Sequence, residues 1–158
     1  MTKELLPILA FDLILLLAAL DDIRRLRISN VLPLALVTAF GFQLIVNGIP
    51  PGLWQHAASF AAVLAGGVLL FAKGMLGGGD AKLLAGTALW FDLAGLMVLL
   101  PAIAVVGGLT ALLLVIIRWM VPAKAAAGGN WAALRRRGPI PYAVPIGIGA
   151  FMSIHVVT

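Results

Sequence analysis

Apolar residues run through this chain in long blocks that are separated by turn residues or charged residues. Six such blocks are almost wholly apolar, and they cover residues 5–20, 31–46, 53–72, 81–91, 95–121 and 140–157. A helix that crosses the hydrocarbon core of a bilayer needs about 20 predominantly apolar residues. The pattern therefore predicts an all-α chain with about six transmembrane helices, of which the fourth is short.

The breaks between the blocks carry clear signals. The first block ends in the charged cluster Asp21-Asp22-Ile23-Arg24-Arg25. The second closes at Asn47-Gly48-Ile49-Pro50-Pro51-Gly52, whose glycines and prolines indicate a turn. The third leads into Gly77-Gly78-Gly79-Asp80. Glycine-rich backbone beside an acidic residue, with long apolar sequence on both sides, makes this last break the most unusual feature of the chain.

The short fourth block determines how deep Asp80 lies. If Asp92 marks the end of that block, Asp80 precedes it by twelve residues, or about 18 Å of helix. The hydrocarbon core is about 30 Å thick, so Asp80 would lie below the membrane surface. In the alternative, the fourth helix continues through Asp92 to Leu100 and turns at Pro101, which would bring Asp80 nearer to the surface.

Composition leads to the same class of protein. The 158 residues are 63% hydrophobic and only 11% charged, against about 45–50% and about 25% in ordinary soluble domains. We therefore expect one transmembrane domain over residues 1–158, without a separate soluble domain. Residues 1–4 lead into the first apolar block, which has no small-residue cleavage site, so this block is predicted to be a retained helix.

The basic residues predict an orientation. If the loops between six helices alternate sides, ten of the eleven Lys and Arg residues share one side and only Lys3 is opposite. The positive-inside rule makes that side cytoplasmic and puts both termini outside. Five or seven helices would scatter these charges. We interpret the basic loops, and the net charge of +5, as contacts for anionic lipids rather than for nucleic acid.

Several kinds of chemistry are excluded. The chain has no cysteine, and its two histidines, His56 and His155, are far apart in the sequence. A disulfide framework, thiol catalysis and a Cys-ligated zinc site are therefore absent, and no metal or cofactor is predicted. The acidic residues remain as the candidates for catalysis or binding. A carboxylate inside or close to a bilayer is costly and is by default a functional-site hypothesis.

Three of the six acidic residues, Asp21, Asp22 and Asp80, fall on the predicted cytoplasmic side. Two carboxylates that come close together cannot both ionise easily, so they share a proton. One can then deprotonate a water molecule while the other protonates a carbonyl oxygen or a leaving amine. Such a pair hydrolyses peptide bonds without metal, thiol or serine triad.

The residues alone also allow structural interpretations of these carboxylates. Asp21 and Asp22 suit a solvated helix end, with Arg24 and Arg25 as ionic partners. Asp12, in the middle of the first block, suits a buried structural carboxylate bonded to a neighbouring helix.

Two motifs resemble the signatures of type IV prepilin peptidases. Residues 22–30, Asp-Ile-Arg-Arg-Leu-Arg-Ile-Ser-Asn, are similar to the first signature, an Asp followed by basic residues and Ile-Pro-Asn; Ser29 stands in place of the proline. Residues 77–83, Gly-Gly-Gly-Asp-Ala-Lys-Leu, are similar to the second, the Gly-x-Gly-Asp motif of intramembrane aspartyl proteases. Residues 140–147 resemble the last helix of the family.

This resemblance implies an aspartic endopeptidase without cofactor, with Asp22 and Asp80 as the catalytic dyad; the motif spacing selects Asp22 over Asp21. It implies prepilin or pseudopilin precursors as substrates, each with a basic leader, a glycine at the cleavage point and an apolar helix. Cleavage is expected at the cytoplasmic face of the inner membrane. Larger family members carry two Cys-x-x-Cys pairs and methylate the product. This cysteine-free chain resembles the short, peptidase-only form of tight-adherence (Flp-type) pili or archaeal preflagellins.

A different function also fits part of the pattern. A small proton- or ion-coupled transporter would use a discontinuous helix and a buried acid such as Asp12. A structural partner of a secretion machine would leave the paired aspartates unexplained. The roles of Asp21 and Lys82 stay open, since Lys82 could act on Asp80 or bind a lipid phosphate, and no oligomeric state is predicted.

Overall fold

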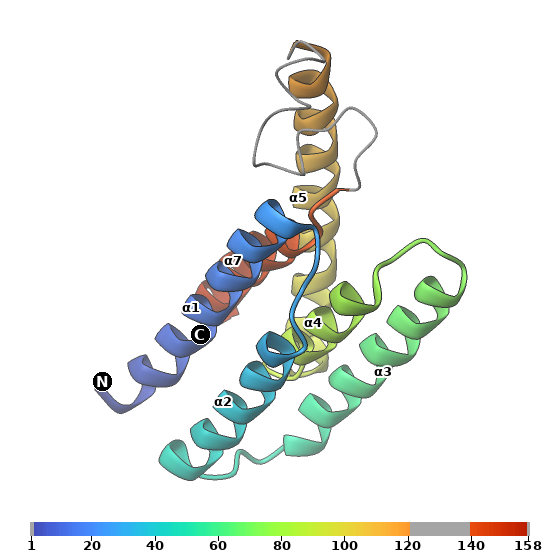
Figure 1. Cartoon of the computed structure of the whole chain (residues 1–158). Helices are drawn as coiled ribbons and strands as arrows, with labels where there is room; N and C mark the ends of the chain where they lie inside the picture. The colour runs from blue at the N-terminus through green and yellow to red at the C-terminus, as the bar shows by residue number, and fades with distance from the viewer. Residues whose placement is uncertain (1, 121–139, 158) are drawn as a thin grey trace.

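The computed structural model describes residues 2–120 and 140–157. Within these ranges the chain forms six α-helices and no strand (Figure 1). The helices are α1 (Thr2–Arg25), α2 (Val31–Asn47), α3 (Leu53–Ala72), α4 (Gly78–Ala88), α5 (Leu93–Met120) and α7 (Ala143–Val157). Each predicted apolar block corresponds to one helix, so the predicted all-α fold is confirmed. The basic residues of 121–139, which the topology argument used, lie outside the described residues.

The fourth helix is short, as predicted. It has 11 residues, begins three residues earlier than its apolar block and ends at Ala88. The Asp92 carboxylate accepts a hydrogen bond from the backbone N–H of Gly95 (2.7 Å). It thereby caps the first turn of α5, which continues through Pro101. The alternative boundary, with one helix running through Asp92 to Leu100, is therefore wrong.

Helix α4 lies inside the bundle, where it packs against α2, α3 and α7. Six of its eleven residues are buried: Ala81, Leu83, Ala85, Gly86, Thr87 and Ala88. A helix that is covered on most sides belongs to a core rather than to a lipid-facing surface. The neighbouring helices therefore fix its position, and with it the position of Asp80.

Aromatic side chains hold the far end of α4. Trp90 follows the helix, and its ring centroid lies 4.8 Å from that of Phe11 on α1 and 5.8 Å from that of Phe40 on α2. Its indole N–H donates to the carbonyl of Leu36 (3.2 Å). Aromatic pairs of this kind contribute about 0.5–1.5 kcal/mol each beyond their buried area. This cluster fastens α1, α2 and α4 to one another.

The outer surface is strongly apolar. Helices α3 and α5 are long and apolar enough to cross a membrane, and α2 and α7 are shorter apolar helices. Large side chains such as Met97, Trp119 and Val156 are exposed on them. A continuous apolar exterior of this kind suits lipid rather than water. Helices α1 and α7 lie side by side (Figure 1), so that α1 begins and α7 ends at the same end of the bundle.

Candidate active site

The two predicted catalytic residues come together at one end of the bundle. Asp22 lies in the last turn of α1, and Asp80 lies in the first turn of α4. Both line one cavity of about 320 Å³, whose other walls include Leu26, residues 74–77 and Tyr142. They are close enough for the negative charge of Asp22 to act on Asp80. Residues that are 58 positions apart in the sequence are thus neighbours in the fold.

The two adjacent aspartates of α1 have different environments. The side chain of Asp21 forms an ion pair with Arg25 on the same helix (3.2 Å), in which the Arg25 side chain is 76% exposed. Asp22 is only 4% exposed, and its Oδ2 accepts a hydrogen bond from the backbone N–H of Ala143 (2.9 Å). The solvated helix end is therefore Asp21 with Arg25, while Asp22 faces the interior and the cavity.

Asp80 is held by the beginning of its own helix. Its carboxylate accepts a hydrogen bond from the backbone of Gly77, the residue that precedes the first turn of α4. This contact is half of a capping box, in which an acidic side chain in the first turn satisfies a backbone N–H before the helix. A side chain at position 77 would overlap Asp80 Oδ2. The glycine therefore makes room for the carboxylate.

The two sequence motifs also contact each other away from the aspartates. A side chain at Gly79 would lie 3.0 Å from the Ile28 side chain, so the loop after α1 rests directly on α4. The Lys82 ammonium donates a hydrogen bond to the Asn30 side chain (2.9 Å). This contact, which the sequence did not indicate, ties α4 to the loop before α2.

Ser29, which replaces the usual proline, forms a hydrogen bond in the same loop. Its hydroxyl accepts a hydrogen bond from the backbone N–H of Val31 (3.4 Å). The side chain thereby satisfies one of the free N–H groups at the start of α2.

Sequence reasoning missed two contributors to the site. Ala143 donates its backbone N–H to Asp22, and the free N–H groups of a helix beginning just after Pro141 were the available signal. Leu26 ends α1 in the left-handed backbone region (φ 52°) and lines the cavity. A non-glycine residue in that conformation costs about 1–2 kcal/mol, so the turn beside Asp22 is strained.

Asp12 lies elsewhere, in the middle of α1. Its Oδ2 is 3.3 Å from Nε2 of His155 on α7, so the expected bond to a neighbouring helix is present, but the Asp12 side chain is half-buried (19% exposed) rather than buried. Among residues 2–120 and 140–157, no group of three or more His, Asp or Glu residues is arranged to hold a metal ion. The arrangement at the cavity, a carboxylate pair within a mostly apolar bundle, is suited to acid–base hydrolysis.

A comparison with known families defines the class. Residues 9–121 match the family model described as the type IV leader peptidase family. The match covers well over half of the chain and includes both aspartates, and the chain therefore belongs to this family. No curated protein and no solved structure matches the chain.

Membership gives the activity. The protein is an integral membrane aspartic peptidase that cleaves the leader peptide from type IV prepilins. This assignment supports the peptidase interpretation over the transporter. The matched residues end at 121, so α7, with the donor Ala143, lies beyond them.

Proposed function

We propose that Asp22 and Asp80 form the catalytic dyad of this peptidase. The observation that carries the proposal is the shared cavity, which brings one carboxylate from each motif to the same end of the bundle. Asp21, by contrast, is occupied by Arg25. The other acidic residue on α1 with a described side chain, Asp12, is paired with His155. Among the described acidic side chains, Asp92 caps α5, which leaves Asp22 and Asp80 as the pair that lines one cavity.

The chemistry follows from two carboxylates that share one proton. The ionised carboxylate removes a proton from a water molecule, whose oxygen attacks the carbonyl carbon of the scissile bond. The protonated carboxyl group donates to the carbonyl oxygen, and the carbon–nitrogen bond then breaks as the leaving amine takes a proton. The Ala143 N–H holds one oxygen of Asp22, so this carboxylate is oriented before the substrate arrives.

We further propose that the cavity opens on the cytoplasmic face and that both termini are outside. Exposed basic side chains, Arg24, Arg25, Arg27 and Lys82, lie beside the cavity on α1, its following loop and α4. Their clustering at this end supports the orientation, because basic residues accumulate on the cytoplasmic side. Anionic lipid headgroups are the expected partners of these side chains.

The proposed substrate range includes pseudopilins as well as prepilins. The proposed activity is leader removal only, carried out by a single domain that comprises all the helices. The 158 residues contain no cysteine, and the Cys-x-x-Cys pairs that accompany methylation in larger family members are therefore absent. This supports the short form associated with tight-adherence pili.

Co-expression with a prepilin tests the dyad. Asp22→Asn and Asp80→Asn should each lower the rate of leader removal by at least about 10²-fold, because each removes a proton-transfer group. The matched control is Asp21→Asn, which should leave processing close to that of the wild type. Cleavage is measured by the change in precursor mobility in membranes that contain equal amounts of each variant. Normal processing by Asp80→Asn would disprove the dyad.

A further inference from the structure

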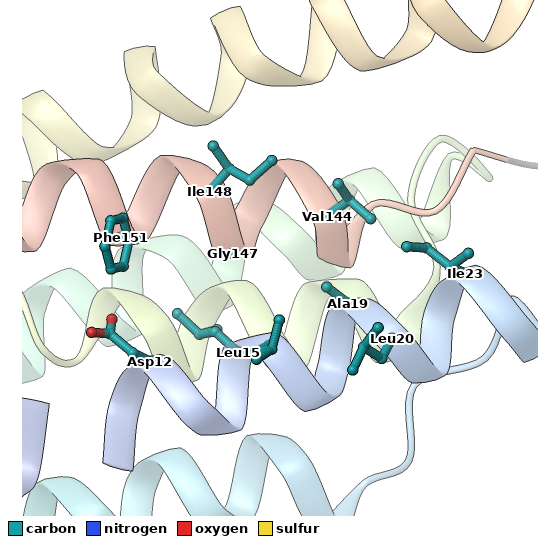
Figure 2. A pocket seen from close by; sticks show the side chains of 10 residues that line it. Asp12, Leu15, Ala19, Leu20, Ile23, Val144, Gly147, Ile148 and Phe151 are labelled. Carbon is teal, nitrogen blue, oxygen red and sulfur yellow. The ribbon is translucent and has the colours of Figure 1, made fainter. Parts of the chain in front are cut away.

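A second cavity, of about 350 Å³, follows the seam between α1 and α7 (Figure 2). Asp12 is the one charged residue among those that line it, and the other lining residues are apolar. Its walls are exposed on the outside of the bundle: Leu16 is 56% exposed and Phe151 is 52% exposed. The cavity is therefore an apolar groove that opens toward lipid, and we call it the α1–α7 groove.

The shape of the groove comes from small residues at its floor. Ala19 and Gly147 lie between the larger side chains of Leu20 and Ile148 (Figure 2). A side chain at Gly147 would lie 3.6 Å from the Leu15 carbonyl oxygen, so the two backbones approach closely there. A floor of small residues between rows of larger ones is the surface into which the side chains of another helix pack.

One end of the α1–α7 groove meets the active site. Ile23 and Val144 line this end, and each is the sequence neighbour of one partner in the Asp22–Ala143 hydrogen bond. Leu26 and Tyr142, slightly further along the same two segments, line the dyad cavity. The groove and the cavity therefore follow one another along a single seam, with Asp22 at the junction.

The other end closes on a carboxylate. Oδ2 of Asp12 contacts His155, but Oδ1 is buried and has no hydrogen-bond partner among the described residues. A buried polar atom without a partner is costly. The Asp12 side chain as a whole is still 19% exposed. A lipid acyl chain in the groove offers no hydrogen-bond donor to this carboxylate, whereas a polypeptide segment can bring a hydroxyl, amide or basic side chain to its exposed part.

We infer that the α1–α7 groove binds the apolar segment of the precursor, as a helix, directly after the bond that is cleaved. This inference rests on the proposed Asp22–Asp80 dyad. Asp12 and Ile23 are eleven residues apart on α1, which corresponds to about 16 Å of helix or three turns. The first ten or so residues after the cleaved bond therefore fit along the groove, and a hydrogen-bond donor about three turns from that bond meets Asp12.

Cross-linking tests where the apolar segment of the precursor binds. The chain has no cysteine, so an introduced cysteine is the only one that can form a disulfide. Ala19→Cys is combined with Asp80→Asn, which keeps the precursor uncut. It is paired with precursors that carry one cysteine at successive positions after the cleavage point. Disulfide formation with Cys at position 19 should peak at every third or fourth position of the precursor, within the first three helical turns after its cleavage point. The matched control is Ala62→Cys, an exposed alanine on α3, which should give no such pattern.

Filling the groove gives a second readout. Ala19→Trp, with the native dyad, should slow cleavage of the membrane-embedded precursor at least about tenfold, because remote binding energy is lost. Ala62→Trp adds the same side chain on α3 and should have little effect. The folding of both variants is checked by thermal unfolding in detergent.

The outcomes separate the two proposals. Cleavage by the Asp80→Asn variant would overturn the dyad, whatever the cross-links show. Suppose instead that Asp80→Asn abolishes cleavage. Equal cross-linking from positions 19 and 62, or normal cleavage by a folded Ala19→Trp variant, would then disprove substrate binding in the groove without affecting the dyad. The groove would in that case be a lipid contact.

Discussion

Two aspartates of α1, ten residues apart, both contact α7, yet their surroundings differ. Asp22 receives a backbone N–H at the wall of a cavity that holds a second carboxylate. Asp12 contacts the imidazole of His155 at the end of an apolar groove. A carboxylate beside a histidine has a partner that can carry the opposite charge, whereas each carboxylate at the cavity has a second carboxylate as its neighbour. The two acids therefore differ both in the neighbouring group and in burial, since Asp22 is 4% exposed and the Asp12 side chain is 19% exposed.

The most direct way to break this comparison is to replace each aspartate by asparagine. Asp22→Asn should reduce prepilin processing by at least about 10²-fold, because asparagine cannot transfer the proton. Asp12→Asn keeps a side chain of the same size with an acceptor oxygen at the end of the α1–α7 groove, so a donor of the substrate still finds a partner and processing should fall by no more than about threefold. Leader removal in membranes measures both, and an equal loss in the two variants would place chemistry at Asp12 as well.

A second variant asks whether the carboxylate must be held in place. Gly77→Ala puts a methyl group where it overlaps Asp80 Oδ2, so the carboxylate has to move. A displacement of about 1 Å can cost about 10²-fold in rate, and we expect a loss of about tenfold to 10²-fold. Gly78→Ala is the matched control, because its methyl group would lie an ordinary 3.4 Å from Phe71. Equal cleavage rates for the two alanine variants would contradict the assigned role of Gly77.

Loss of the Lys82–Asn30 hydrogen bond, at the same end of the molecule, should have a smaller effect on the cleavage rate. Lys82→Met and Asn30→Ala should each slow cleavage several-fold, because the loop after α1 is no longer tied to α4. The double variant should lose little more than either single variant, since both remove one interaction. Losses that multiply in the double variant would show that the two residues act separately. Lys82→Arg should recover part of the rate.

The smallest effect concerns stability at the end of α1. Leu26 has a left-handed backbone (φ 52°), a conformation that glycine adopts without the penalty of other residues. Leu26→Gly should therefore be more stable than Leu26→Ala by about 1 kcal/mol. Within a helix the order would be reversed. Thermal unfolding in detergent compares the two, and a more stable alanine variant would mean that this turn relaxes in the membrane protein.

Long-range periodicity made most of the fold predictable. Every apolar block became one helix, and Asp92 at the end of the fourth block proved to be the cap of α5. The start of α4 was placed three residues late, because glycines favour loops over helices. Gly79 is nevertheless helical, and Ile28 occupies the space that a side chain would need there, which explains why this helical position is a glycine.

The acidic residues of the candidate site were predictable from the sequence, but the groups that hydrogen-bond to them or to their surroundings were not. Motif spacing selected Asp22 and Asp80, which line one cavity. The donor at Ala143, the partner of Lys82 and the partner of Asp12 were not foreseen. These contacts join residues that are 121, 52 and 143 positions apart. Contacts over such distances in the sequence depend on how whole helices cross, and no local pattern encodes that crossing.

The hydrogen bond between Ala143 and Asp22 has a consequence for biosynthesis. Both aspartates are translated within the first 80 residues, but the donor belongs to a helix that emerges more than 60 residues after Asp80. A nascent chain that has inserted α1 to α5 thus carries both acids without the group that orients one of them. For the proposed dyad, a ribosome-bound or prematurely terminated chain therefore lacks the donor that orients Asp22 until α7 has entered the membrane.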